Sequence, residues 1–201
     1  MNPLDSIKGT LIAGAILAIA ITAAVSSYAG GFNSLGLIRW LHIGAGVVWI
    51  GMLYYFNFVQ VPSLAAAGAD KGGPGGAGIT KYVAPRALLW FRWGAVATWV
   101  TGAAYLAHVG WFMGAFSFGA LGTPPPNGNA IGIGAWLGTI MLFNVWVLIW
   151  PNQKKILGIV TATDDEKAKA RRTAFLASRT NTMLSIPMLL FMGASAHGLL
   201  F

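Results

Sequence analysis

Apolar residues along this chain form five long runs, which short polar stretches separate. An α-helix needs about 20 apolar residues to cross the hydrocarbon core of a bilayer, and each run is about that long. The predicted membrane spans are Leu11–Gly30, Gly36–Val61, Ala87–Gly110, Ile131–Trp150 and Thr182–Phe201. We therefore expect an all-α integral membrane protein, a bundle of five transmembrane helices in which residues 1–201 form a single membrane domain.

The first run has two interpretations. Ser27-Tyr28-Ala29, near its end, resembles the small-residue cleavage site of a secretory signal. The many alanine and glycine residues of the run instead suit close packing against a neighbouring helix. We expect a retained span.

The stretch between the fourth and fifth runs has helical signals of its own. Thr163 and Glu166 have the spacing of a capping box, and the stretch begins with acidic residues and ends with basic ones. This pattern predicts a short amphipathic helix over Asp164–Arg179, lying on the cytoplasmic surface of the membrane.

The composition agrees with a membrane protein. Of the 201 residues, 56% are hydrophobic and only 9% are charged, against about 25% charged in an average soluble domain. The net charge of +8 could indicate nucleic-acid binding. The basic residues, however, lie in short connections between apolar runs, as the positive-inside rule expects, so we expect no nucleic-acid partner.

The distribution of basic residues predicts the orientation. The second and fourth connections carry most of them: Lys71, Lys81, Arg86, Lys154, Lys155, Lys167, Lys169, Arg171, Arg172 and Arg179. On the other side Arg39 is the only basic residue, and Gly114–Ala130 has no charge. We expect the N-terminus in the cytoplasm and the C-terminus in the periplasm, across a bacterial inner membrane whose lipid surrounds the helices.

The chain contains no cysteine. It therefore has no disulfide, no thiolate metal site, no iron–sulfur cluster and no CxxCH haem-attachment motif. Any metal chemistry must use histidine, carboxylate or a cofactor that binds as a whole.

The three histidines are the main candidates for such chemistry. His42, His108 and His197 lie on three predicted spans, near the same water boundary. Helices of opposite direction can present His42 and His197 to the two faces of a flat ligand, which predicts haem b with these two residues bound to the iron. His108 is a third candidate, and Arg39, one turn from His42, is placed to pair with a haem propionate.

Two other interpretations of the histidines stay open. They could hold copper or another metal ion. They could also be interfacial residues that form hydrogen bonds with carbonyl groups or lipid headgroups.

A second polar zone lies toward the predicted cytoplasmic side. Its candidate substrate-binding residues are Asn57, Arg92, Asn144 and Asn181. They could line a pocket for a small polar or anionic molecule. Alternatively, the amides tie helices together and the arginine extends toward the membrane surface.

Three stretches resemble a known family. They are Trp40–Pro62, which begins WLHIGAGVVWIG, then Asn144–Gln153, and Arg179–His197. All three are similar to the membrane domain of bacterial PuuD-type urate oxidases. The WxHxxxxxxWxG core of the first stretch also resembles, more weakly, the HemJ-type haem membrane proteins.

The first resemblance implies a membrane redox protein that passes electrons from a purine to a cytochrome c. Three functions follow from it. The chain could be a haem-b electron-transfer subunit that serves a periplasmic cytochrome c or a larger membrane complex. It could be the urate hydroxylase itself, or a non-catalytic accessory subunit, for which Gly134-xxx-Gly138 offers a surface for helix packing.

Overall fold

The computed structural model describes residues 2–26, 32–123, 125 and 129–198, and every regular element in these ranges is a helix. Three of the described helical stretches are long and apolar enough to cross a membrane: Ile7–Val25, Ser34–Ala69 and Ala130–Ile156. This is consistent with an all-α membrane protein. The predicted spans Ala87–Gly110 and Thr182–Phe201 are not among these three. The helix that contains the first carries two arginines, and the helix that contains the second has many charged residues in its first half.

The chain divides into two compact units. The first, Met1–Gly36, contains a 3₁₀ turn, η1 (Pro3–Asp5), and the apolar helix α1 (Ile7–Ser26). α1 begins four residues earlier than the predicted first span. Ser27-Tyr28-Ala29 lies outside the described residues.

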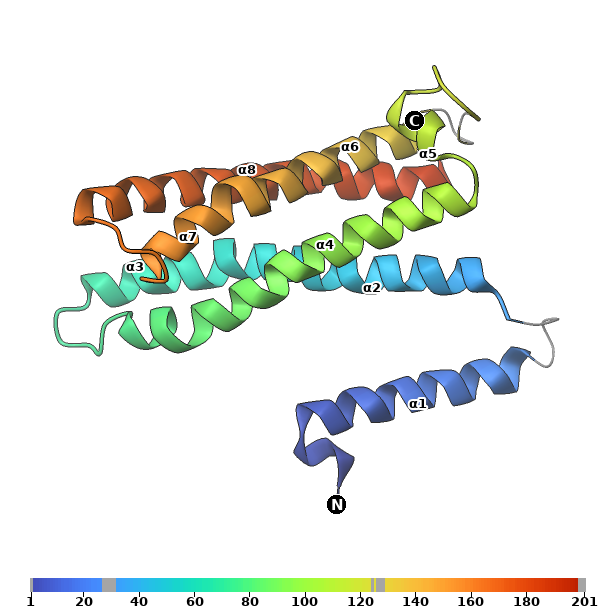
Figure 1. Ribbon diagram of the computed structural model, residues 1–201. Helices are drawn as coiled ribbons and strands as arrows, with labels where there is room; N and C mark the ends of the chain where they lie inside the picture. The colour runs from blue at the N-terminus through green and yellow to red at the C-terminus, as the bar shows by residue number, and fades with distance from the viewer. Residues whose placement is uncertain (1, 27–31, 124, 126–128, 199–201) are drawn as a thin grey trace. The chain divides into compact units, whose positions relative to one another are not determined.

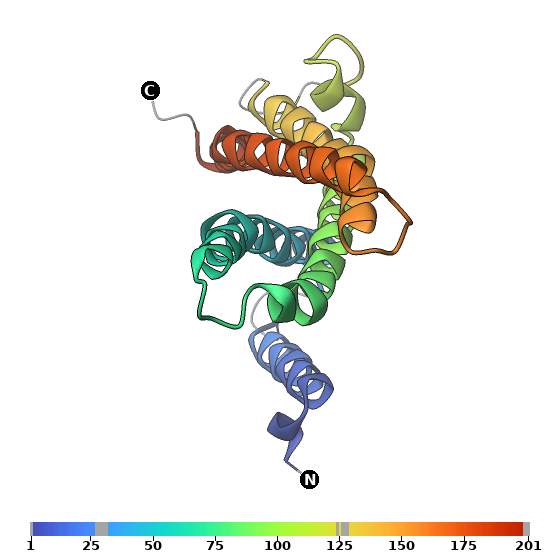
Figure 2. The same cartoon turned by 90° about the vertical axis from the view of Figure 1, so that its left-hand side faces the viewer.

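The second unit, Leu37–Phe201, holds the bundle. Its elements in chain order are α2 (Ser34–Tyr54), the π-helical segment η2 (Tyr55–Gln60), α3 (Val61–Ala69), the π-helical segment η3 (Ile79–Val83), α4 (Ala84–His108), α5 (Phe112–Phe116), α6 (Ala130–Phe143), the π-helical segment η4 (Asn144–Ile149), α7 (Trp150–Ile156) and α8 (Asp164–His197). α6 lies beside the C-terminal half of α8, and η4 and α7 contact the rest of that helix (Figure 1). α4 lies beside the α2–α3 helix and extends toward α6 (Figure 2).

The start of α8 confirms the predicted capping box. The Thr163 N–H donates to Glu166 Oε2 at 2.8 Å, and Glu166 N donates to Thr163 Oγ1 at 3.3 Å. Hydrogen bonds from the Thr163 backbone and side chain hold the pKa of the exposed Glu166 carboxyl below its ordinary value.

The predicted end of this helix is wrong. Instead of a separate short helix over Asp164–Arg179, one 34-residue helix continues to His197. The sequence has no glycine or proline between Asp164 and Pro187 to stop it. In addition, a stripe of alanines at positions 170, 174 and 177 is buried, so the charged half is packed on the bundle along one face.

The core forms where α2, α4, η4 and α8 meet. Its most deeply buried large side chains are Trp49, Leu53, Phe91, Met141 and Val145. α2 and α4 approach very closely at Gly94, where a Cβ atom would lie 3.3 Å from the backbone nitrogen of Trp49. A side chain at this position would require the backbone of α2 to move by some tenths of an ångström.

The Gly134-xxx-Gly138 motif is also internal, so its expected role as a docking surface is wrong. Both glycines are buried in α6, and a Cβ atom at Gly134 would lie 3.2 Å from Cγ of Met192 on α8. Gly134 thus lets α8 pack against α6 within the chain.

We predict that Gly94→Leu destabilises the bundle by about 1–3 kcal/mol, because its side chain must push α2 away from α4. Thermal unfolding in detergent, followed by circular dichroism, measures the effect. Gly44→Leu is the matched control, since Gly44 is exposed on α2 and no atom lies within 4 Å of its Cβ position. Equal unfolding temperatures for the two variants would contradict the proposed tight crossing.

Candidate functional site

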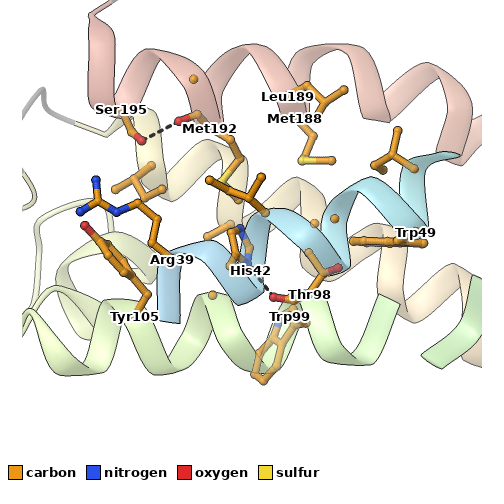
Figure 3. Close-up of a pocket in the computed structure, with 18 of the residues that line it drawn as sticks. Arg39, His42, Trp49, Thr98, Trp99, Tyr105, Met188, Leu189, Met192 and Ser195 are labelled. Carbon is orange, nitrogen blue, oxygen red and sulfur yellow. Dashed lines mark hydrogen bonds between the residues drawn. The ribbon is translucent and has the colours of Figure 1, made fainter. Parts of the chain in front are cut away.

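A cavity of about 830 Å³ lies in the second unit between α2, α4, α6 and α8 (Figure 3). This is near the upper end of the ~300–1,000 Å³ typical of ligand and cofactor pockets. Most of its lining is apolar. The polar side chains on its wall are those of Arg39, His42, Trp49, Thr98, Trp99, Tyr105, Ser195 and His197.

The cavity opens to the surface between α2 and α8. Ile43 and Val47 on α2 and Leu189 on α8 line it and are also 57%, 68% and 46% exposed. The inner end of the same seam is closed by a hydrogen bond of 3.0 Å between Tyr54 Oη and Ser185 Oγ. In a bilayer the open side of the cavity faces lipid chains.

His42 is held in one orientation by α4. Its Nδ1 lies 2.8 Å from the carbonyl oxygen of Thr98 (Figure 3). Because a carbonyl oxygen can only accept, Nδ1–H is the donor, and in the neutral ring Nε2 keeps its lone pair. This is how metal-binding histidines are commonly oriented.

A glycine makes room for this ring. A Cβ atom at Gly102 on α4 would lie 2.8 Å from Cε1 of His42 and 3.0 Å from its Nδ1. Such contacts are too short for two non-bonded atoms, so Gly102 is required for the observed position of His42.

Three of the four residues predicted to bind a cofactor line this cavity: Arg39, His42 and His197. Arg39 lies toward one end, with its guanidinium carbon 5.8 Å from the centroid of the Tyr105 ring. His197 is the last residue of α8 and is exposed. His108 is the last residue of α4, is exposed, and is not among the residues that line the cavity.

The described residues contain no group of three or more His, Cys, Asp or Glu side chains placed to hold a metal ion.

Trp49 adds an unexpected donor at the cavity. Its side chain is 1% exposed and lines the cavity, yet its indole N–H has no hydrogen-bond partner. Buried N–H groups are nearly always bonded, so this group calls for an acceptor from a ligand or a water molecule. From the sequence alone Trp49 was indistinguishable from a core residue.

The predicted substrate residues lie further inward. Asn144 Nδ2 donates to Asn181 Oδ1 at 2.8 Å, and Asn181 Nδ2 donates to the Met141 carbonyl at 3.0 Å. Asn57 Nδ2 donates to the Leu53 carbonyl and to Ser178 Oγ, both at 2.8 Å.

These bonds coincide with irregular helix. Asn57 lies in η2, and Asn144 begins η4. The wide π turns disturb the regular ladder of backbone hydrogen bonds, and polar side chains commonly compensate for such breaks inside membranes. The asparagines here bind carbonyls next to the wide turns and tie both segments to α8.

Arg92 is separate from these amides. Its guanidinium carbon lies 3.9 Å from the centroid of the Trp150 ring, a cation–π contact. The structure thus brings Asn144 and Asn181 together and places Asn57 and Arg92 on other partners.

Comparison with known families supports one of the sequence resemblances. Residues 112–201 match the family described as "Urate oxidase N-terminal". The resemblance to a urate oxidase-type membrane domain is therefore confirmed over this part, a little under half of the chain. The matched part includes the α6 and α8 walls of the cavity, whereas His42 and Thr98 precede it. No curated protein and no solved structure matches the chain significantly.

We predict that Asn181→Leu lowers the free energy of unfolding by about 1–3 kcal/mol, because it leaves the buried amide of Asn144 unpaired. The double variant Asn144→Leu/Asn181→Leu should lose less than the sum of the two single variants. Unfolding in detergent measures all three. Strict additivity would show that the two amides do not depend on each other.

Proposed function

We propose that this chain, whose residues 112–201 match a urate oxidase-type membrane domain, binds haem b in its cavity and transfers electrons in the membrane. The observation that carries the proposal is the orientation of His42. Its Nδ1–H is bound to the Thr98 carbonyl, and its Nε2 is left free beside a large, mostly apolar cavity.

The cavity has room for a flat macrocycle. Gly138 of α6 is buried and Gly193 of α8 is exposed, and both line the cavity; no atom lies within 4 Å of the Cβ position of either. These glycines border open space in the cavity. Together with the apolar walls, they favour a ligand with a broad, uncharged face.

The polar groups also fit haem. Arg39 is the only formally charged side chain among the described residues that line the cavity, and it suits an anionic propionate. The indole N–H of Trp49 is a second donor for which the protein provides no acceptor.

When bound, haem supplies a one-electron redox centre. His42 binds its iron, and the hydrogen bond to Thr98 fixes the ring and makes it a stronger donor. The apolar walls limit water around the site, which influences the reduction potential.

The lateral opening provides a route of entry for haem from the bilayer. With the orientation that the basic residues indicate, the cavity lies in the periplasmic half of the membrane. A periplasmic cytochrome c or a larger membrane complex would then accept the electrons.

The family match favours one further candidate, a urate hydroxylase whose substrate binds in the inner zone of Asn57, Arg92, Asn144 and Asn181. Anaerobic addition of urate to the oxidised, haem-loaded chain tests it. This candidate would be supported if urate reduces the haem of the wild-type chain but does not reduce the haem of Arg92→Ala. A chain that binds no haem would instead be an accessory subunit.

We predict that purified wild-type protein gives a b-type band in its reduced-minus-oxidised spectrum and that His42→Ala loses it. His108→Ala is the matched control, because His108 is exposed and does not line the cavity. It should keep the wild-type haem content. A His42→Ala variant with full haem content would disprove the assignment of His42.

We also predict that Gly102→Ala lowers haem content several-fold, since the added methyl group displaces the His42 ring from the Thr98 carbonyl. Gly44→Ala, two residues from His42 and free of neighbours within 4 Å of its Cβ position, should bind haem normally. Haem per protein, measured by the pyridine haemochrome assay, compares the two. The idea fails if both variants bind equally.

A further inference from the structure

The second axial ligand of the proposed haem is the open question at this site. The side chains of α8 that line the cavity and carry a lone pair suited to iron are those of Met188, Met192 and His197. The geometry points to Met192, and we infer that the iron is held between His42 and Met192. This inference rests on the proposed haem site and goes beyond the sequence prediction of a His42–His197 pair.

A contact between η2, which continues α2, and the middle of α8 sets the relative height of α2 and α8. The short side chains of Asn57 and Ser178 touch at 2.8 Å, so their backbones lie at similar levels. The helices are antiparallel, and counting 15 residues outward from each gives His42 on α2 and Gly193 on α8. Met192 is next to that level, whereas His197 lies four residues, roughly 6 Å, further out.

The second contact of this seam, between Tyr54 and Ser185, gives a different count. Twelve residues outward from this pair are His42 and His197. The tyrosine side chain is long, however, and helical side chains lean toward the N-terminus of their helix, which is the outward direction for α2. Tyr54 therefore reaches a residue of α8 that lies further out than its own backbone. The Asn57–Ser178 pair, whose side chains are shorter, is the better guide to the relative height of α2 and α8.

The view into the cavity agrees with this register. Met192 extends from α8 on the side of the cavity opposite His42, and Ser195 lies further along, toward Arg39 and Tyr105 (Figure 3). His197 lies beyond Ser195 in the chain, at the exposed end of the helix.

The side chain of Met192 packs against α6. The three atoms nearest to a Cβ position at Gly134 are Cγ, Cε and the backbone nitrogen of Met192, at 3.2–3.3 Å. Met192 therefore contacts α6 through the carbon atoms on both sides of its sulfur. Met188, by contrast, is 5% exposed and belongs to the hydrophobic core.

A thioether ligand has a functional consequence. Replacing a second histidine by methionine raises the reduction potential of a haem. The proposed site would then accept electrons readily and suit an acceptor of high potential, such as a cytochrome c.

The test uses the full chain, purified in detergent and loaded with haemin. Wild-type ferric protein should show the far-red charge-transfer band of methionine-ligated haem. Met192→Leu should lose this band, turn high-spin and shift to a lower midpoint potential, while His42 retains the haem. Met192→His should give a bis-histidine spectrum, also at lower potential.

Two variants serve as controls. Met188→Leu makes the same substitution one turn away, and His197→Ala removes the competing ligand; both should keep the wild-type spectrum and potential. The inference is overturned if His197→Ala alone turns the iron high-spin, or if Met192→Leu leaves the spectrum unchanged. In both cases the haem site itself would stand, whereas a wild-type chain that takes up no haem would overturn the proposed function as well.

Discussion

The close crossing of α2 and α4 is the constraint on which the cavity depends. Gly94, Thr98 and Gly102 follow one another at intervals of four residues and so share one face of α4. Gly94 admits the backbone of α2, and Gly102 admits the His42 ring. Between them, the Thr98 carbonyl accepts a hydrogen bond from the Nδ1–H of His42. A bulky side chain anywhere on this face would separate the helices and deprive the imidazole of its acceptor.

The helices α2 and α8, by contrast, do not approach each other closely along their whole length. Polar contacts join the end of α2 and the following η2 segment to the middle of α8, through Tyr54 with Ser185 and Asn57 with Ser178. Further out the cavity separates them. α8 is held there by α6, where Gly134 receives Met192. The seam between α2 and α8 is thus closed by hydrogen bonds at Tyr54 and Asn57 and is open to the surroundings beside the cavity.

Much of this arrangement could be predicted from the sequence, and the remainder has physical reasons. Apolar runs predicted the helices, and the Thr163 capping box predicted where α8 begins. Histidine and arginine are conspicuous in an apolar chain, so His42 and Arg39 could be singled out. The partner of His42 is a backbone carbonyl, which leaves no trace in a sequence. Met192 looks like any apolar residue of a membrane helix, and only the packing of α8 against α6 and α2 distinguishes it. The charged half of α8 packs on the bundle through buried alanines, and the many charged residues around them make this face hard to recognise in the sequence.

The two candidate sites are separated by a layer of apolar side chains, and this limits how they can cooperate. Trp49 lines the cavity and Asn57 belongs to the inner polar zone, while Leu53, one turn from each, is completely buried. Met141, also fully buried, contributes to the same core, and its carbonyl receives the Asn181 amide. A polar molecule in the inner zone would have to cross this packed layer to reach the cavity, at a high cost in desolvation. If the chain oxidises a purine, the substrate therefore stays on the inner side, and only electrons pass to the cavity.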